Sequence, residues 1–203
     1  MSKQFLPGGK SELRTELEEL ARAKEKTAEL CGRIIEEAGT SISLLHRGEN
    51  SKSRHLVQSL GAKLKELDAL VKDKPSLSRV SLVKDAKMEY VEASGFYSLV
   101  ANGRIPSHRE LGVEPDEFLL GLADLIGELR RRCLDAVRKS DYAESERSFE
   151  KMEKLYEFVW QFEYPKREVR GLRHKLDVDR RLLDDTRLIL AQSHISLSFQ
   201  KEH

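Results

Sequence analysis

The stretch FLLGLADLIGEL, residues 118–129, places apolar side chains at three- and four-residue intervals. This spacing matches the turn of about 3.6 residues in an α-helix with one buried face. The stripe continues beyond the stretch, and its members are Phe118, Leu122, Leu125, Ile126, Leu129, Cys133 and Val137. Pro115 suits the first position of such a helix, and the polar run that begins at Lys139 ends it. The stretch therefore predicts a helix over about residues 115–138.

The same helical spacing recurs along the rest of the chain. It predicts further helices over about residues 11–46, 56–73, 76–102 and 142–162, and from about 167 onward. Pro75, Gly103 and Pro165 fall at the expected breaks. Ser107 and Glu110 form a capping box, which predicts one or two further turns of helix. No segment shows sustained alternation with a period of two, so we expect no strand.

These patterns predict an all-α fold, namely an antiparallel bundle of about six to seven long helices with short connections. We expect a single helical domain over residues 11–203. Residues 1–10, which include Pro7, Gly8 and Gly9, are expected to be disordered.

Composition limits the classes of function. The 203 residues include 36 Lys and Arg against 35 Asp and Glu, so any basic footprint for a nucleic acid must be local. Cys31 and Cys133 both fall on apolar stripes, which favours small buried side chains over a disulfide. The chain has no apolar signal core after Met1 and no run of about 18 apolar residues. We therefore expect a cytoplasmic protein that does not enter a membrane.

Carboxylates carry the only chemical signal. Familiar catalytic motifs are absent, and the histidines lack metal-ligand spacing. Glu89 and Glu92 are three residues apart, with Asp85 one turn earlier on nearly the same helix face. Oxygen-only ligands select hard cations such as Mg²⁺ or Mn²⁺. The pattern alone leaves a solvated helix face as the alternative, and Asp141 equally fits the N-cap of a helix.

Four blocks of sequence resemble the translin superfamily. Residues 89–93, EYVEA, are similar to the EYVEA segment of its translin-associated factor X branch, and residues 118–129 are similar to YLLGVADLTGEL. Residues 44–47, LLHR, resemble the end of the family's first helix, and Asp141 falls where the family has Gly-Asp. The order and approximate spacing of the blocks agree over residues 12–195.

The resemblance implies a metal-dependent endoribonuclease. Translin keeps the second glutamate but has an apolar residue in place of Glu89, so a chain with both Glu89 and Glu92 resembles the catalytic branch. By the same resemblance, Glu89, Glu92 and Asp141 are the catalytic and metal-binding residues, with Mg²⁺ or Mn²⁺ as the cofactor. It also implies a homo-oligomer, expected to be an octamer, that encloses single- or double-stranded RNA. Asp85 has no counterpart in the family, so we expect it to matter less.

RNA would be held mainly through its phosphates. The candidate contacts lie around the first turn between helices and beside the core of the fourth long helix, and they are His46, Arg47, Lys52, Arg54, His55, Arg130, Arg131 and Arg132. Two other classes remain open, a non-catalytic translin-like module that binds RNA or DNA and a structural helical scaffold.

Overall fold

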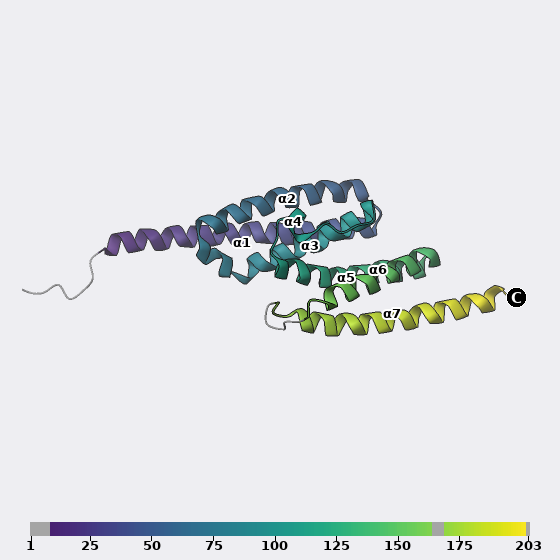
Figure 1. The fold of residues 1–203 in the computed structure, drawn as a ribbon. Coiled ribbons are helices and arrows are strands. Elements are labelled where there is room, and N and C mark those ends of the chain that lie inside the picture. Colours follow the sequence, from purple (N-terminus) through teal and green to yellow (C-terminus); the bar gives the residue numbers. More distant parts are fainter. Residues whose placement is uncertain (1–8, 164–168, 202–203) are drawn as a thin grey trace, which may run out of the picture.

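The computed structural model describes residues 9–163 and 169–201. Within these ranges the chain forms one 3-10 helix and seven α-helices (Figure 1). They are α1 (Lys10–His46), α2 (Asn50–Asp73), η1 (Pro75–Arg79), α3 (Ser81–Asn102), α4 (His108–Leu111), α5 (Pro115–Arg138), α6 (Tyr142–Trp160) and α7 (Leu172–Lys201). The same ranges contain no strand, so the predicted all-α fold is confirmed.

The long helices form two groups of three that meet along a central seam. In the first group α1 packs against α2 and α3, and in the second α5 packs against α6 and α7 (Figure 1). The groups join where α3 lies against α5. Val91 and Phe96 of α3 and Leu125 and Ile126 of α5 are all fully buried, so one hydrophobic core continues across the seam.

The long helices bury most of the apolar stripes that their sequences predict. On α1, Ile34 and Ala38 have no exposed surface, whereas Leu13 and Leu17 are 58% and 57% exposed. Both leucines belong to the first turns of α1, and Figure 1 shows that the N-terminal part of this helix projects beyond the bundle. The cysteines of α1 and α5 are free and completely buried, as predicted.

Several helices begin at other residues than the sequence predicts, and α2 already begins at Asn50, six residues before the predicted start. The sequence predicts a helix from Ser76, but α3 begins at Ser81 because the preceding residues form η1. Leu77 is fully buried there, and its carbonyl oxygen accepts a hydrogen bond of 3.0 Å from the Val80 amide, which turns the chain before α3 starts. Of residues 1–10, which are expected to be disordered, Lys10 begins α1, and residues 1–8 lie outside the described residues, as does the break expected at Pro165.

A close approach between α3 and α5 fixes the geometry of the seam. Gly121 on α5 lies against Met88 and Val91 on α3, and a Cβ built at position 121 would be 2.7 Å from the Met88 carbonyl oxygen. The same Cβ would be 2.7 Å from the Cβ of Val91. Both distances are well inside van der Waals contact, so a residue without a side chain is needed for the helices to come this close.

Candidate functional site

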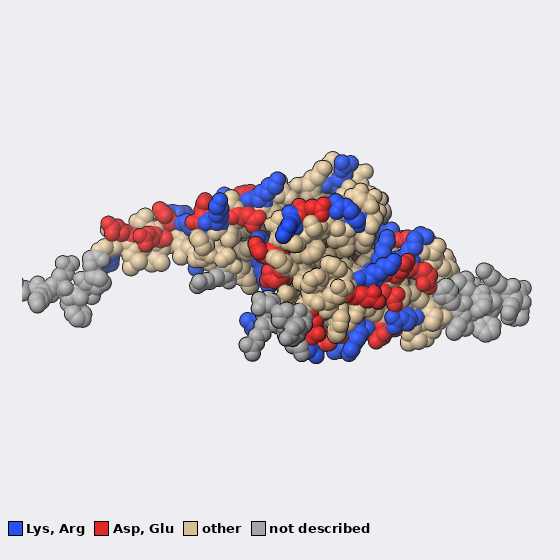
Figure 2. All heavy atoms as spheres, in the orientation of Figure 1, with Lys and Arg blue, Asp and Glu red and all other residues tan. Residues whose placement is uncertain are grey.

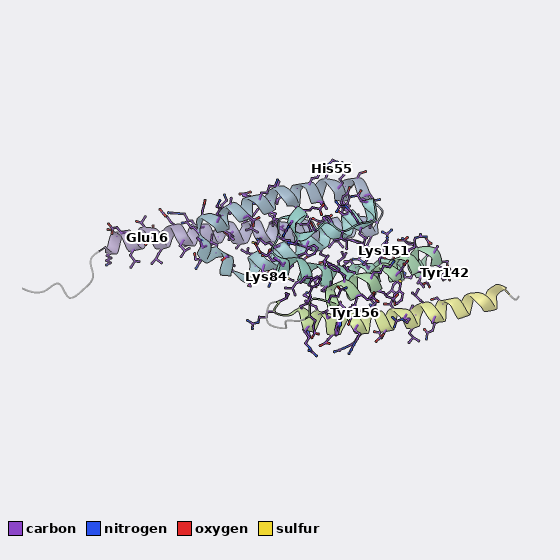
Figure 3. All side chains as sticks on the ribbon, viewed as in Figure 1. Glu16, His55, Lys84, Tyr142, Lys151 and Tyr156 are labelled. Atoms are coloured by element: carbon purple, nitrogen blue, oxygen red, sulfur yellow. The ribbon has the colours of Figure 1, made fainter. Side chains whose placement is uncertain are left out.

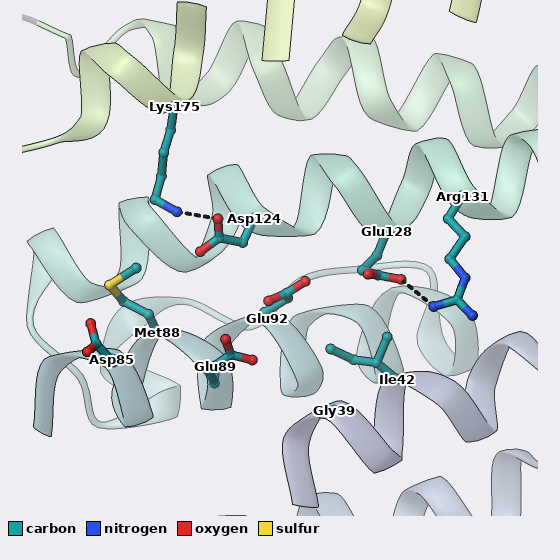
Figure 4. A pocket seen from close by; sticks show the side chains of 10 residues that line it. All are labelled: Gly39, Ile42, Asp85, Met88, Glu89, Glu92, Asp124, Glu128, Arg131 and Lys175. Carbon is teal, nitrogen blue, oxygen red and sulfur yellow. Dashed lines mark hydrogen bonds and ion pairs between the residues drawn. The ribbon is translucent and has the colours of Figure 1, made fainter. Parts of the chain in front are cut away.

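A pocket lined by acidic residues lies on the seam beside this close approach. Its volume is about 620 Å³ (Figure 4). Four helices line it, with Gly39 and Ile42 from α1, Asp85, Met88, Glu89 and Glu92 from α3, Asp124, Glu128 and Arg131 from α5, and Lys175 from α7. We refer to this cavity as the acidic pocket.

Helix periodicity gathers the five carboxylates of the acidic pocket. Asp85, Glu89 and Glu92 follow one another at four- and three-residue spacing on α3, and Asp124 and Glu128 are four residues apart on α5. Each set therefore occupies one face of its helix. Figure 4 shows the two sets directed toward the same space between α3 and α5.

The carboxylates perturb one another because they share a poorly solvated space. Glu92 is only 8% exposed. Burial, followed by the negative charges of Glu89, Asp124 and Glu128, raises the pKa of Glu92 from 4.5 to about 9. Burial, followed by the charge of Asp124, also raises the pKa of Glu89. The acidic pocket thus holds more negative charge than its surroundings stabilise.

Two cations line the acidic pocket and offset part of this charge. Lys175 Nζ donates a hydrogen bond to Asp124 Oδ1, and Arg131 Nη1 lies 3.7 Å from Glu128 Oε2 (Figure 4). Against five lining carboxylates these two side chains leave an excess of negative charge. An anionic pocket of this kind attracts cations.

His46 lies behind the acidic pocket, where the sequence predicts an RNA contact. Its side chain is only 4% exposed, so little of the imidazole is available at the surface of this chain. Its Nε2 hydrogen-bonds Glu128 Oε2 at 2.5 Å, and its ring packs 5.1 Å from the ring of Phe96. A buried imidazole in this place orients the Glu128 carboxylate, as outer-shell groups do in metal sites.

Asp141, which the resemblance implies as the third metal ligand, does not line the acidic pocket of this chain. It is the N-cap of α6, and its Oδ1 accepts a hydrogen bond of 3.0 Å from the Glu144 amide. Glu128 precedes the end of α5, Arg138, by ten residues, which corresponds to about 15 Å of helix. Figure 3 shows Tyr142, the neighbour of Asp141, far along the bundle from Lys84. Lys84 directly precedes Asp85, the first carboxylate of the acidic pocket on α3.

The remaining predicted RNA contacts fall into three groups. Arg47 and Lys52 both pair with Glu49, at 3.0 Å and 2.5 Å, and form a small ionic cluster at the turn between α1 and α2. Arg54 and His55 are exposed on α2, where Figure 3 shows His55 on the outside of the bundle.

The three arginines of α5 have different surroundings. Arg130 donates a hydrogen bond to Thr186 Oγ1 at 3.1 Å and joins α5 to α7, and Arg132 Nε lies 2.6 Å from Glu144 Oε1 and joins α5 to α6. Both serve packing between helices. Arg131 alone of the eight predicted contacts lines the acidic pocket.

The carboxylates of α5 are the site residues that the sequence interpretation missed. Asp124 and Glu128 lie within residues 118–129, the stretch that decided the fold. Two acids four residues apart inside an apolar helix were the available signal, since buried carboxylates are rare without a partner. Lys175 carried no such signal, because α7 is rich in charged residues and a lysine there is expected to be exposed to solvent.

The donor set of the acidic pocket suits a hard divalent cation. Glu89, Glu92, Asp124 and Glu128 offer only oxygen atoms, which Mg²⁺ and Mn²⁺ prefer. Among the described residues no three acidic, His or Cys side chains already stand close enough to hold a metal ion. Binding would therefore require these side chains to turn toward a common centre, and their shared charge favours that movement once a cation is present.

The molecular surface is electrostatically mixed. On the face drawn in Figure 2, Lys and Arg are interspersed with Asp and Glu, as the near-zero net charge leads one to expect. None of the described helices has the length and apolar character needed to cross a membrane.

Comparison with solved structures reveals close similarity of fold. The chain superposes on AfC3PO, and on AfC3PO in complex with duplex RNA, with a TM-score of 0.83 and 32% sequence identity in both cases. These matches cover 92% of this chain and 97% and 96% of those chains. Apo-NeC3PO gives a TM-score of 0.84 over 93% of this chain and 98% of its own, and its 22% identity shows the shared fold alone.

Comparison of the sequence with those of known proteins identifies the family of this chain. An uncharacterized protein of Methanocaldococcus jannaschii is 33% identical over 165 residues, which are 80% of this chain and 72% of that protein. The model of the translin family matches residues 10–183, which include every residue that lines the acidic pocket. The chain therefore belongs to the translin family.

Proposed function

We propose that this protein is a divalent-metal-dependent endoribonuclease and that the acidic pocket is its active site. The observation that carries the proposal is the convergence of Glu89, Glu92, Asp124 and Glu128 on one cavity, with burial and mutual repulsion raising the pKa of Glu92 to about 9. Strongly perturbed carboxylates in a cavity are typical of catalytic and metal sites.

Each residue has a definable task. Glu89, Glu92 and Asp124 would supply oxygen ligands for Mg²⁺ or Mn²⁺, and Glu128 a further ligand oriented by His46. The cation, when bound, supplies Lewis-acid stabilisation of charge on the scissile phosphate and increases the acidity of water. Arg131 at the same cavity would contact a phosphate of the RNA, since guanidinium groups bind phosphate through paired hydrogen bonds.

Within the family, we place the chain closest to the catalytic branch, that of translin-associated factor X. The resemblance at residues 89–93 retains both glutamates, and both line the acidic pocket. Asp141, which the resemblance offered as the third ligand, is replaced in this proposal by Asp124. Asp124 also lies in a block that resembles the family, residues 118–129, so replacing Asp141 by Asp124 is consistent with the resemblance.

RNA is the proposed substrate because a relative 32% identical, AfC3PO, has been solved in complex with duplex RNA. We propose in addition a homo-oligomer, an octamer by the resemblance, whose interior holds the RNA. A cytoplasmic location belongs to the same proposal and rests on the two free cysteines, which are both buried in the core.

The proposal is tested by incubating labelled single- and double-stranded RNA with the protein, with Mg²⁺, with Mn²⁺ or with EDTA. We expect internal cleavage only with a dication. The variants Glu89→Gln, Glu92→Gln and Asp124→Asn should each lower the cleavage rate by about a hundredfold or more, because each removes a ligand that the reaction needs. RNA binding, followed by anisotropy, should survive in all three.

A suitable control is Asp135→Asn, because Asp135 lies on the same helix as Asp124 but pairs with Arg138 at 3.1 Å, outside the acidic pocket. Asp85 is a poor control because it lines the pocket as well. Full cleavage by a Glu89→Gln, Glu92→Gln double variant would contradict the proposal. Metal-independent RNA binding without cleavage would instead identify a nucleic-acid-binding module, and absence of RNA binding a scaffold.

A further inference from the structure

Lys175 and Asp179 lie one turn apart on α7 beside the acidic pocket. Lys175 lines the pocket, and its Nζ donates a hydrogen bond to Asp124 Oδ1 (Figure 4). Residues four apart on a helix share a face, so Asp179 is on the side of α7 from which Lys175 extends. The two residues thus form an acid and a base on α7 next to an acid of α5.

Asp179 is a buried carboxyl with an unused hydrogen-bonding atom. It is only 5% exposed, and its Oδ2 has no hydrogen-bond partner among the described residues. Burial, followed by the charge of Asp124, raises the pKa of Asp179 to about 7, and the charge of Lys175 acts in the opposite direction. Buried polar atoms are nearly always paired in folded proteins, so this oxygen is poised for a partner in another state of the pocket.

Lys175 can serve as that partner. Its ammonium group sits on a flexible four-carbon stem, so its position is not fixed by the helix. Ion pairs between residues four apart on a helix are within the reach of such a side chain. The Lys175 side chain is 29% exposed, so the ammonium group can move at the mouth of the pocket while it keeps some contact with water.

We propose that Lys175 exchanges between two carboxylates: it pairs with Asp124 when the acidic pocket holds no dication, and with Asp179 when a dication binds Asp124. This inference rests on the proposed function, since it requires a metal ion in the pocket. It makes Lys175 a built-in competitor of the metal and Asp179 a positioning residue that receives Lys175 once it is displaced.

The exchange gives Lys175 and Asp179 a role in each state of the pocket. In the metal-free protein Lys175 offsets part of the repulsion among the five carboxylates. A dication at Asp124 would repel the ammonium group and compete for the same oxygen, so the lysine must leave. At Asp179 it would give the unpartnered oxygen a hydrogen bond and keep its own charge paired.

The test is a titration of the full chain with Mn²⁺, in the absence of RNA, by isothermal calorimetry. Lys175→Met keeps most of the stem but removes the competing charge, and it should lower the Kd for Mn²⁺ by about fivefold or more. Lys175→Arg restores a cation and should remain near the wild type. Asp179→Asn should raise the Kd by about threefold in the wild type but leave it unchanged in the Lys175→Met background, because coupled residues are non-additive.

Arg131→Met provides the matched control, since it removes the other cation of the pocket. In the Arg131→Met background, Asp179→Asn should raise the Kd for Mn²⁺ as much as it does in the wild type, because Asp179 pairs with Lys175 and not with Arg131. Melting temperatures in EDTA and in Mn²⁺ provide a second readout, with a larger Mn²⁺-induced rise for Lys175→Met than for the wild type.

Two results would overturn the exchange while leaving the proposed function intact. One is equal Mn²⁺ affinity of the wild type and Lys175→Met. The other is a change in the Kd for Mn²⁺ on Asp179→Asn that is equally large in the wild type and in the Lys175→Met background. An equal change would mean that the substitution acts only through the loss of a negative charge. Failure of the wild type and of Lys175→Met to bind Mn²⁺ at all would instead overturn the metal site itself.

Discussion

Gly121 of α5 lies so close to Met88 of α3 that a Cβ at position 121 would come within 2.7 Å of the Met88 carbonyl oxygen. Met88 directly precedes Glu89, and Asp124 follows Gly121 by less than one helical turn. The contact therefore sets how closely the acidic faces of the two helices approach. Packing of the hydrophobic seam and assembly of the acidic pocket depend on the same missing side chain.

Gly121→Ala should lower the free energy of unfolding by about 1–3 kcal/mol, because overpacking forces the helices apart. It should also weaken Mn²⁺ binding, since α3 and α5 carry opposite halves of the pocket. Urea denaturation and calorimetric titration measure the two effects. Gly127→Ala on the same helix is the control: its Cβ would meet nothing within 4 Å, and alanine favours helix. A Gly121→Ala variant as stable as Gly127→Ala would contradict the packing argument.

Glu92 should make the stability of the metal-free protein depend on pH. Its pKa is raised from 4.5 to about 9 in the folded chain, so the folded state holds this proton more tightly than the unfolded state. The stabilisation is complete below the lower value and is lost as the pH rises through the higher one. In EDTA, unfolding free energy should therefore fall between these pH values in the wild type.

Glu92→Gln should flatten this pH dependence and be the more stable protein at pH 9, by at least about 1.4 kcal/mol, the equivalent of a tenfold change in proton affinity. Chemical denaturation of both proteins across the pH range measures the difference. Saturating Mn²⁺ should reverse the order, because it stabilises the charged carboxylate only in the wild type. Parallel pH curves for the two proteins would mean that Glu92 titrates normally.

Asp141 should affect stability and not chemistry. Asp141→Ala removes the side chain that accepts from the Glu144 amide and should cost about 0.5–2 kcal/mol, whereas Asp141→Asn keeps a good N-cap and should cost much less. Thermal melting measures both. RNA cleavage by Asp141→Asn should equal that of the wild type. A hundredfold loss of cleavage without loss of stability would restore Asp141 to the active site, in which case a second chain must supply it.

Arg131 should contribute to RNA affinity through a phosphate, and Arg132 should not. Arg131→Gln should weaken binding to all RNA sequences alike and reduce the slope of log affinity against log salt by about one. Arg132→Gln removes the pair with Glu144 and should lower stability with little change in RNA affinity. Fluorescence anisotropy over a salt series distinguishes them. The opposite ranking would place the RNA path along α6 in place of the acidic pocket.

The helices follow from patterns that lie within single segments of the sequence. Apolar residues at three- and four-residue spacing specify which face of each helix is buried, and this information is local to one helix. For the same reason the sequence placed Glu89 and Glu92 on one face of α3 and indicated that Asp141 could cap a helix. These inferences needed no knowledge of which helices are neighbours.

Which helix faces meet depends on packing between helices and could not be predicted from these patterns. The approach of α5 to α3 at Gly121 brings Asp124 and Glu128 to the glutamates of α3 and leaves Asp141 at the far end of α5. The packing of α1 against α3 likewise buries His46 beside Phe96 of α3, where its ring also hydrogen-bonds Glu128 of α5, although the sequence suggested an RNA contact there. The physical reason is that burial, and the pKa shift of a residue such as Glu92, arise from groups on other helices, whereas helical periodicity relates residues within one helix only.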